Sequence, residues 1–166
     1  MQIGIISDIH DRRDNLRTVL LTLEECDALV CLGDLCAPFI VNDLAQGFPR
    51  DIHIVFGNND GDLMRIERNA AAACNEERQV IFHGEFAELS FEGKRFALIH
   101  YDSIGRALAR SDQYDVVCFG HNHEHEVTMD GDTVLINPGE VHGLVKGVVS
   151  ACIYDTETGD ADILIY

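Results

Sequence analysis

The stretch QIGIISDIH, residues 2–10, is an apolar run that ends abruptly in an aspartate and a histidine. Its apolar part has the length of a buried β-strand. It lacks the basic start and the longer apolar segment of a signal peptide, which favours the cytoplasm as the compartment. We therefore predict a strand over 2–7 that delivers Asp8 and His10 at its carboxyl end.

The first half of the chain repeats such strands and joins them by helices. The segment 13–26 would place Leu16, Val19, Leu20 and Leu23 on one face of a helix. Further strands are expected over 28–33 and 51–57, and further helices over 39–45 and 62–74. A β-α-β-α-β order predicts a largely parallel sheet.

The second half has a different pattern, in which paired strands are joined by short turns that contain glycine and therefore predict hairpins. The hairpins are expected over 86–100, 125–137 and 149–166, with a helix over 104–110 and a strand over 115–120. We expect this tail to be antiparallel. Two sheets packed face to face with helices outside would satisfy both halves, so we predict an α/β fold in one domain, residues 1–166.

Composition excludes several classes of function. The formal net charge of −17 and the lack of a basic patch disfavour nucleic acid bound through its backbone. No segment reaches the roughly 18 uninterrupted apolar residues of a membrane span. Cys31, Cys118 and Cys152 lie within apolar runs and no CxxC pair occurs, so we expect buried thiols rather than disulfides or a structural zinc site.

Polar residues directly follow five of the predicted strands. In sheets of this kind, ligands bind at the carboxyl ends of the strands, so these residues would converge on one crevice. They are Asp8, His10, Asp34, Asn58, His100, His121 and His123. Taken singly, they could be solvated turn residues, a helix-capping carboxylate or a polar edge strand. Taken as an ordered set, they are better explained as metal ligands.

The chemistry of this set favours two metal ions. Imidazole and carboxylate groups suit divalent manganese, iron, cobalt, nickel or zinc, and one ion uses about four to six ligands. Seven candidates therefore suit two ions that share a carboxylate, the arrangement that supports displacement at phosphorus. Gly33, Gly57 and Gly120 each precede a candidate ligand and allow sharp turns there.

The ordered motifs Asp-x-His, Gly-Asp, Gly-Asn-x-Asp, His and Gly-His-x-His resemble those of the calcineurin-like metallophosphoesterase superfamily. The chain length and the segment INPGE at 136–140 look like its small bacterial and archaeal phosphodiesterase subgroup. The resemblance covers nearly the whole chain. It implies a four-layer α/β/β/α sandwich of two mixed sheets with flanking helices, and a binuclear metal site.

The resemblance also implies a ligand assignment and a reaction. The first metal would be held by Asp8, His10, Asp34 and His123, and the second by Asn58, His100 and His121 together with a bridging Asp34. The subgroup implies manganese, with nickel, iron, cobalt or zinc as alternatives. The implied reaction is hydrolysis of a small phosphodiester by in-line attack of a metal-bridging hydroxide. Relatives often form dimers, so the resemblance allows a homodimer.

Two positions depart from the family pattern. Many relatives have histidine where this chain has Asn59, whose amide can orient a phosphate oxygen but has no usable proton-transfer pKa. Tyr101 stands where a glycine is common after the motif histidine and would reshape the mouth of the cleft. Asp60 is expected to support the ligands from behind.

The remaining histidines fall outside the motifs. We expect His125 and His142 on the substrate side or in solvent, with His142 at the cleft mouth, and we interpret His53 and His83 as structural. Cys36 follows Asp34 by two residues and is expected to be a packed loop thiol.

Two alternatives to a phosphodiesterase stay open. One is a non-catalytic scaffold for protein contacts with the same fold, against which the intact ligand set argues. The other is a phosphomonoesterase or nucleotidase, which a comparison of monoester with diester turnover would separate.

Overall fold

Eleven strands form two sheets, and four helices accompany them, in a computed structural model that describes residues 1–166. The elements are β1 (Gln2–Ile6), α1 (Arg13–Leu23), β2 (Ala28–Cys31), α2 (Ile40–Gly47), β3 (Asp51–Ile54), α3 (Leu63–Ala73), β4 (Val80–Phe82), β5 (Phe86–Phe91), β6 (Lys94–Ile99), α4 (Asp102–Ala109), β7 (Val116–Cys118), β8 (Glu126–Asp130), β9 (Thr133–Asn137), β10 (Ser150–Asp155) and β11 (Ala161–Ile165).

The first sheet has the order β11-β10-β1-β2-β3-β4. Strands β1 to β3 run parallel, as the alternation of strands and helices predicted, and β4 extends this parallel set beside β3. The hairpin β10–β11 is added on the other side, with β10 antiparallel to β1. Both the first half and the end of the chain therefore contribute to one sheet. Because β1, β2 and β3 are parallel, their carboxyl ends lie at the same edge of the sheet.

The second sheet has the order β5-β6-β7-β9-β8. The expected hairpins β5–β6 and β8–β9 are present, but β7 pairs in parallel with both β6 and β9. The expectation of a purely antiparallel tail was therefore wrong. The helix α4 carries the chain from β6 back to the start of β7, and such a crossover produces parallel neighbours.

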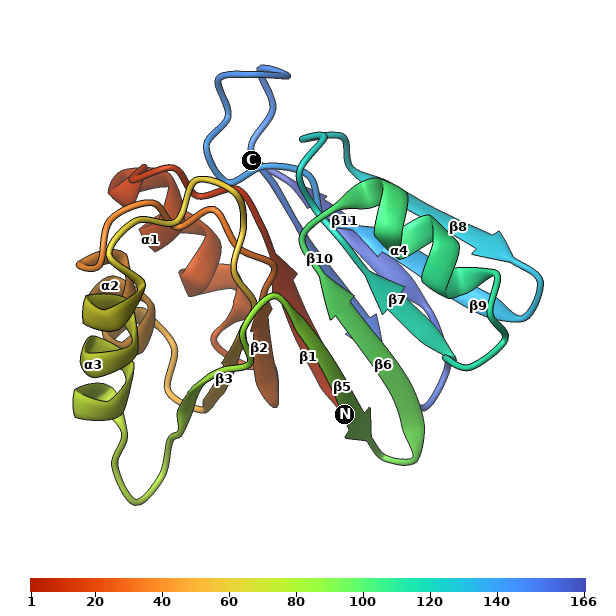
Figure 1. Ribbon diagram of the computed structural model, residues 1–166, viewed down its shortest axis with the longest axis horizontal. Coiled ribbons are helices and arrows are strands. Elements are labelled where there is room, and N and C mark those ends of the chain that lie inside the picture. Colours follow the sequence, from red (N-terminus) through yellow and green to blue (C-terminus); the bar gives the residue numbers. More distant parts are fainter.

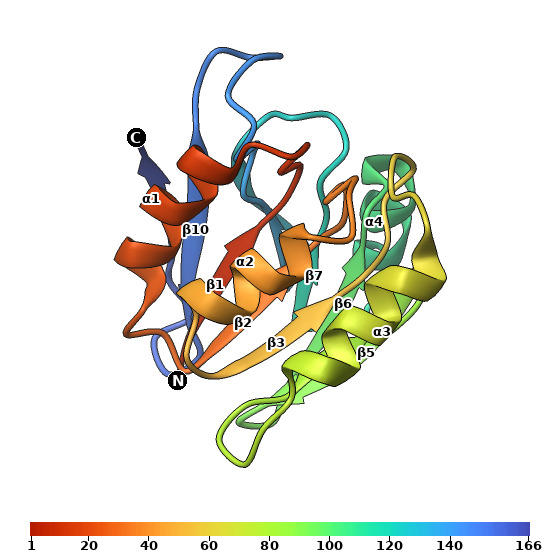
Figure 2. The same ribbon diagram turned by 90° about the vertical axis from the view of Figure 1, so that its left-hand side faces the viewer.

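The two sheets pack face to face between helices, which gives the predicted α/β/β/α layers (Figure 1). The helices α1, α2 and α3 cover the outer face of the first sheet, and α4 covers the second (Figures 1 and 2). The predicted stripe of α1, namely Leu16, Val19, Leu20 and Leu23, is buried. Burial of such a side chain stabilises the fold by about 1.5–3 kcal/mol. Three apolar clusters fill the spaces between the four layers.

Local differences from the predicted elements are small. The strand β4 was missed because three residues carry too little periodicity to stand out. The helix α4 begins two residues earlier than expected, and α1 ends three residues earlier. Cys31, Cys118 and Cys152 are buried, and all six cysteines are free thiols. None of the helices is both long and apolar enough to cross a membrane.

Candidate metal centre

The loops that follow β1 and β2 lie against each other and bring two buried carboxylates together. The amide of Asp8 donates to Gly33 O at 3.1 Å, and the amides of Ile9 and His10 both donate to Asp34 O, at 3.0 and 2.9 Å. Asp8 and Asp34 are almost completely buried. Because buried carboxylates are costly without partners, their surroundings should supply compensating groups.

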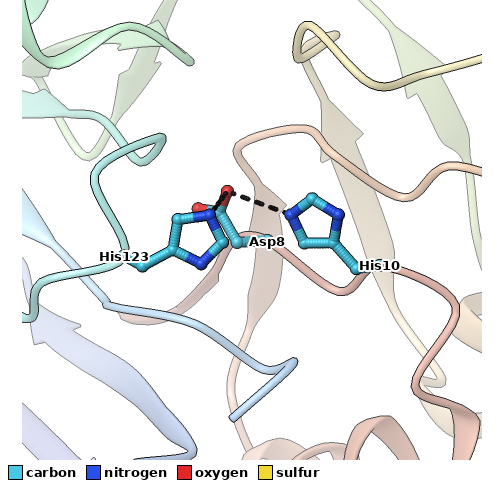
Figure 3. A group of neighbouring side chains, drawn as sticks. All are labelled: Asp8, His10 and His123. Carbon is cyan, nitrogen blue, oxygen red and sulfur yellow. Dashed lines mark ion pairs between the residues drawn. The ribbon is translucent and has the colours of Figure 1, made fainter. Parts of the chain in front are cut away.

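The first group of converging donors is formed by Asp8, His10 and His123 (Figure 3). The Oδ1 atom of Asp8 lies 3.7 Å from His10 Nε2 and 3.5 Å from His123 Nε2. Asp8 Oδ1 and His10 Nε2 are both buried and have no hydrogen-bond partner. Unpartnered buried polar atoms that face one point are the arrangement expected around a metal ion.

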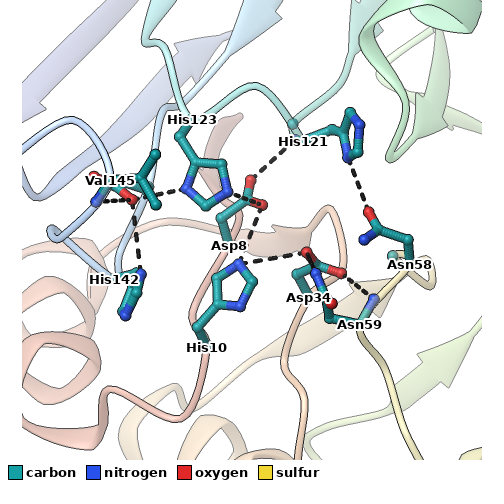
Figure 4. Close-up of polar contacts among 12 residues, drawn as sticks. Asp8, His10, Asp34, Asn58, Asn59, His121, His123, His142 and Val145 are labelled. Atoms are coloured by element: carbon teal, nitrogen blue, oxygen red, sulfur yellow. Dashed lines mark hydrogen bonds and ion pairs between the residues drawn. The ribbon is translucent and has the colours of Figure 1, made fainter.

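The second group is formed by Asn58, His100 and His121, and Figure 4 shows the contact between Asn58 and His121. Asn58 Oδ1 lies 3.0 Å from His100 Nε2 and 2.9 Å from His121 Nδ1, and these two nitrogens are 3.3 Å apart. Three donor atoms from the ends of three strands thus meet within hydrogen-bonding distance.

The carboxylate of Asp34 lies between the two groups. Its Oδ2 is 3.4 Å from His10 Nε2 of the first group and 3.6 Å from His100 Nε2 of the second. No other carboxylate oxygen approaches an imidazole of each group so closely, which is the position that a bridging ligand requires.

Hydrogen bonds behind the rings determine which nitrogen faces the centre. His100 Nδ1 lies 2.7 Å from Leu32 O, and His123 Nδ1 lies 2.7 Å from Glu140 Oε2. A carbonyl or carboxylate oxygen can only accept, so each Nδ1 carries a proton, and in the neutral ring the lone pair is then on Nε2. Lone pairs directed inward are what a metal ligand needs.

The buried Glu140 was missed as a member of the site. It lies just after β9, and its carboxylate accepts bonds from the ring of His123 and from the amides of Val145 and Lys146. The segment INPGE drew attention to this region, but no local pattern connects residue 140 with a ring 17 residues earlier. A carboxylate behind a ligating histidine is a common support of metal sites.

The backbone is strained around this centre. Left-handed φ values, between +41° and +73°, occur at seven non-glycine residues in or beside it: Asp8, His10, Asp11, Asp34, Cys36, His121 and His123. Only three other non-glycine residues of the chain have positive φ. Such conformations cost on the order of 1–3 kcal/mol each and concentrate at functional sites.

Two glycines allow the close approach of the loops. A Cβ at Gly57 would collide with Asp34 Oδ1, and a Cβ at Gly120 would collide with Ser7 Oγ. The sharp turns expected at these glycines are therefore places where one loop rests on the carboxylate-bearing loop next to it.

Asn59 and Asp60 hold the loops that carry the ligands. The backbone amide of Asn59 donates to Asp34 Oδ1 and its side-chain amide to Asp34 Oδ2, both at 2.8 Å. We expected this side chain to orient a phosphate, whereas here it is turned to a carboxylate. Asp60 accepts the amides of Asp34, Cys36 and Gly57 at 2.8–3.0 Å, and so joins the loops after β2 and β3.

The other predicted residues lie at the edge of the centre. His125 is exposed and belongs to neither donor group. The ring of His142 lies 5.0 Å from the ring of His10, and its buried Nδ1 has no hydrogen-bond partner. Cys36 Sγ lies 3.4 Å from His10 Nδ1, on the side of that ring away from the carboxylates.

The electrostatics of the centre couple its acids and bases. Burial raises the pKa of Asp8, but the polar side chains of His10 and Ser7 and the imidazoles of His100 and His123 together lower it by more, so that the pKa lies below its ordinary value. The carboxylate of Asp8, followed by that of Asp34, raises the pKa of His10. The carboxylates and the protonated imidazoles thus stabilise each other's charges. Divalent cations bound at this centre would neutralise the same carboxylates.

The donor set fits divalent first-row metal ions. Donor atoms of Asp8, His10 and His123 lie within 4.8 Å of one another, and so do those of Asp8, Asp34 and His100. Oxygen and imidazole nitrogen are the ligand types that manganese, iron, cobalt, nickel and zinc accept. The unpartnered Asp8 Oδ1 and His10 Nε2 leave lone pairs for such an ion.

Comparisons with known proteins place the chain in a family. Residues 1–159 match the model of the calcineurin-like phosphoesterase superfamily domain. The chain is 30% identical over 161 residues to phosphodiesterase MJ0936 of Methanocaldococcus jannaschii, covering 95% of this chain and 94% of that protein.

Solved structures share the fold. One described as a novel archaeal phosphodiesterase superposes with a TM-score of 0.90 at 28% identity, covering both chains completely. Wild-type Vps29 of Entamoeba histolytica, solved with Zn²⁺, has a TM-score of 0.66 at 18% identity, covering 100% of this chain and 98% of that one. At that identity the second likeness concerns the fold alone.

Proposed function

Because the chain belongs to the calcineurin-like phosphoesterase superfamily, we propose that it hydrolyses phosphodiesters with the help of two divalent metal ions. The chain is a metal-dependent phosphoric ester hydrolase. The number of ions, the diester substrate and the in-line course of the reaction are our proposal. The observation that carries it is the position of Asp34 Oδ2 between two groups of donors.

We assign the ligands by the donor groups. Asp8, His10 and His123 would hold one ion, Asn58, His100 and His121 the other, and Asp34 would be shared. When bound, two such ions neutralise charge on the phosphoryl group and activate a water for in-line attack on phosphorus. Manganese is the ion we favour, with nickel, iron, cobalt or zinc as alternatives.

The protein's own groups orient this machinery. Leu32 O and Glu140 hold the rings of His100 and His123 with their Nε2 lone pairs inward. Asn59 fixes Asp34 through two hydrogen bonds. Since an amide has no usable proton-transfer pKa, Asn59 cannot protonate a leaving group. We therefore expect diesters with stable leaving anions, such as aryl oxides, to react fastest.

The test combines metal binding with turnover. Calorimetric titration of metal-free protein with Mn²⁺ should give two equivalents. The loaded protein should hydrolyse bis(p-nitrophenyl) phosphate faster than p-nitrophenyl phosphate. A folded, metal-loaded protein that turned over no aryl phosphodiester would refute the proposal. Faster turnover of the monoester would favour a phosphomonoesterase instead.

A further inference from the structure

The segment 141–149, between β9 and β10, projects beyond the rest of the molecule at the end where the candidate metal centre lies (Figures 1 and 2). Its tip carries Leu144 and Val145, which are 62% and 59% exposed. We call these two side chains the apolar shelf. Single exposed aliphatic residues are ordinary, but adjacent ones beside a reactive centre indicate a contact surface.

The apolar shelf is connected directly to the metal centre. The amide of Val145 donates to Glu140 Oε2 at 3.3 Å, and the same oxygen accepts the ring proton of His123 at 2.7 Å. Figure 4 shows Val145 beside His123. One carboxylate oxygen therefore separates the backbone of the shelf from a candidate ligand.

The shelf is held in place from both flanks. Asn15 of α1 donates to the carbonyls of Val141 and His142, each at 3.0 Å. The side chain of Lys146 pairs with Glu124 at 2.6 Å, in the loop that carries two candidate ligands. These anchors fix the tip away from the core, so its apolar side chains are preorganised for an incoming group.

The charges around the shelf restrict what that group can be. Lys146 is the only cation of the segment 141–149, and Glu124 neutralises it. The segment 141–149 therefore offers no free cation to a second phosphate. The net charge of −17 also disfavours a polyanion as the bound group. An uncharged apolar group matches the aliphatic side chains of Leu144 and Val145, and the segment 141–149 itself has no unpaired cation that would favour an anionic group.

We infer that the apolar shelf binds the non-reacting ester group of the phosphodiester, and that this group is an uncharged aryl or alkyl chain. The inference rests on the proposed function, because it requires the phosphorus to lie at the metal centre. Removal of about 60 Å² of apolar surface from water corresponds to about a tenfold gain in binding. The gain should appear mainly in KM, since the shelf does not touch the reacting atoms.

The test varies the non-reacting group and keeps the leaving group constant. Methyl, hexyl, phenyl and 5-carboxypentyl esters of p-nitrophenyl phosphate are compared on the manganese-loaded protein. The hexyl and phenyl esters should exceed the methyl ester about tenfold in kcat/KM, and the carboxypentyl ester should not. Leu144→Ser and Val145→Ser should each reduce the hexyl-to-methyl ratio several-fold. Leu21→Ser is the matched control, because Leu21 is 68% exposed on α1, and it should keep the ratio.

A binding measurement makes the result independent of turnover. Methyl NMR signals of Leu144 and Val145 should shift when dihexyl phosphate is added to protein loaded with diamagnetic Zn²⁺, and not with dimethyl phosphate. Equal kcat/KM across the esters, with unshifted methyl signals, would overturn the inference while the proposed function stood. A ratio that both shelf variants leave unchanged would also overturn it. So would a dimer that dissociates in the variants without any effect of the ester group. If no diester is turned over, the proposed function fails and the NMR titration still decides the shelf.

Discussion

Apart from the exposed His125, the histidines of this molecule form two clusters that differ in what surrounds each ring. At the metal centre, rings such as His100 and His123 are bonded on one nitrogen and face a buried carboxylate with the other. Away from it, His53 of β3 and His83 after β4 bond to each other at 3.0 Å, with Phe91 packed edge-on against His53.

The comparison shows that grouped imidazoles alone do not make a metal site. The pair of His53 and His83 satisfies itself, and neither ring forms an ion pair with a carboxylate. The metal centre instead combines imidazoles with two buried carboxylates and leaves donor atoms unpartnered. What separates the clusters is unfilled donor capacity, not the number of rings.

The largest difference between the two histidine clusters should appear when the carboxylate of Asp34 is removed. Asp34→Ala should lower kcat/KM by at least about 10³-fold, because under the proposed function it would remove a ligand of both ions, and such ions contribute several kcal/mol to catalysis. His53→Gln should change kcat/KM by less than about twofold. Steady-state kinetics on bis(p-nitrophenyl) phosphate, with circular dichroism to confirm folding, measures both. Comparable losses in the two variants would remove the distinction between the clusters.

A second substitution tests whether the close approach of the Gly57 backbone to the carboxylate of Asp34 is needed for the metal centre. Gly57→Ala should destabilise the protein by about 1–3 kcal/mol and reduce activity, because the added methyl group collides with the carboxylate of Asp34. Gly61→Ala in the same loop is the control, since a Cβ there meets only Cys36 O at 3.9 Å. Urea unfolding and kinetics compare them. Equal stability of the two variants would mean that the loop can relax without cost.

A third change tests the support behind a ring. Glu140→Gln keeps the size of the side chain but removes the charge that accepts the ring proton of His123. Loss of such support lowers metal affinity or activity about 10–100-fold. Glu126→Gln is the control, because Glu126 only forms a partly exposed ion pair with Arg106 and accepts a hydrogen bond from Thr128, and it supports no candidate ligand. Calorimetric Mn²⁺ affinity is the measurement, and an unchanged affinity in Glu140→Gln would show that His123 needs no orienting carboxylate.

Much of the fold and of the candidate site could be predicted from the sequence, because the spacing of apolar residues and the order of the motifs can be recognised in short segments of the chain. The stripe of α1 and the polar residues at strand ends such as Asp8 follow from spacing alone. The parallel pairing of β7 with β9 could not be predicted, because it depends on the path of the chain between them. The bond between His123 and Glu140 joins residues 17 positions apart, and the bond between His53 and His83 joins residues 30 positions apart. A local sequence pattern cannot predict either contact.

The smallest expected effect concerns the self-satisfied pair and its response to acid. The pKa of His53 is lowered to about 4, mainly by burial and also by the adjacent His83, while Asp51 opposes the shift. The unfolded chain, with a pKa near its ordinary value of about 6.5, therefore binds more protons between pH 6.5 and 4. Stability contributed by neutral His53 is thus present above pH 6.5 and is lost as the pH falls towards 4. His53→Gln removes this titration, so from pH 7.5 to pH 5 it should gain about 1–2 kcal/mol relative to the unmodified protein. Urea unfolding at both pH values measures the gain, and parallel pH profiles would show that the pair does not sense acid.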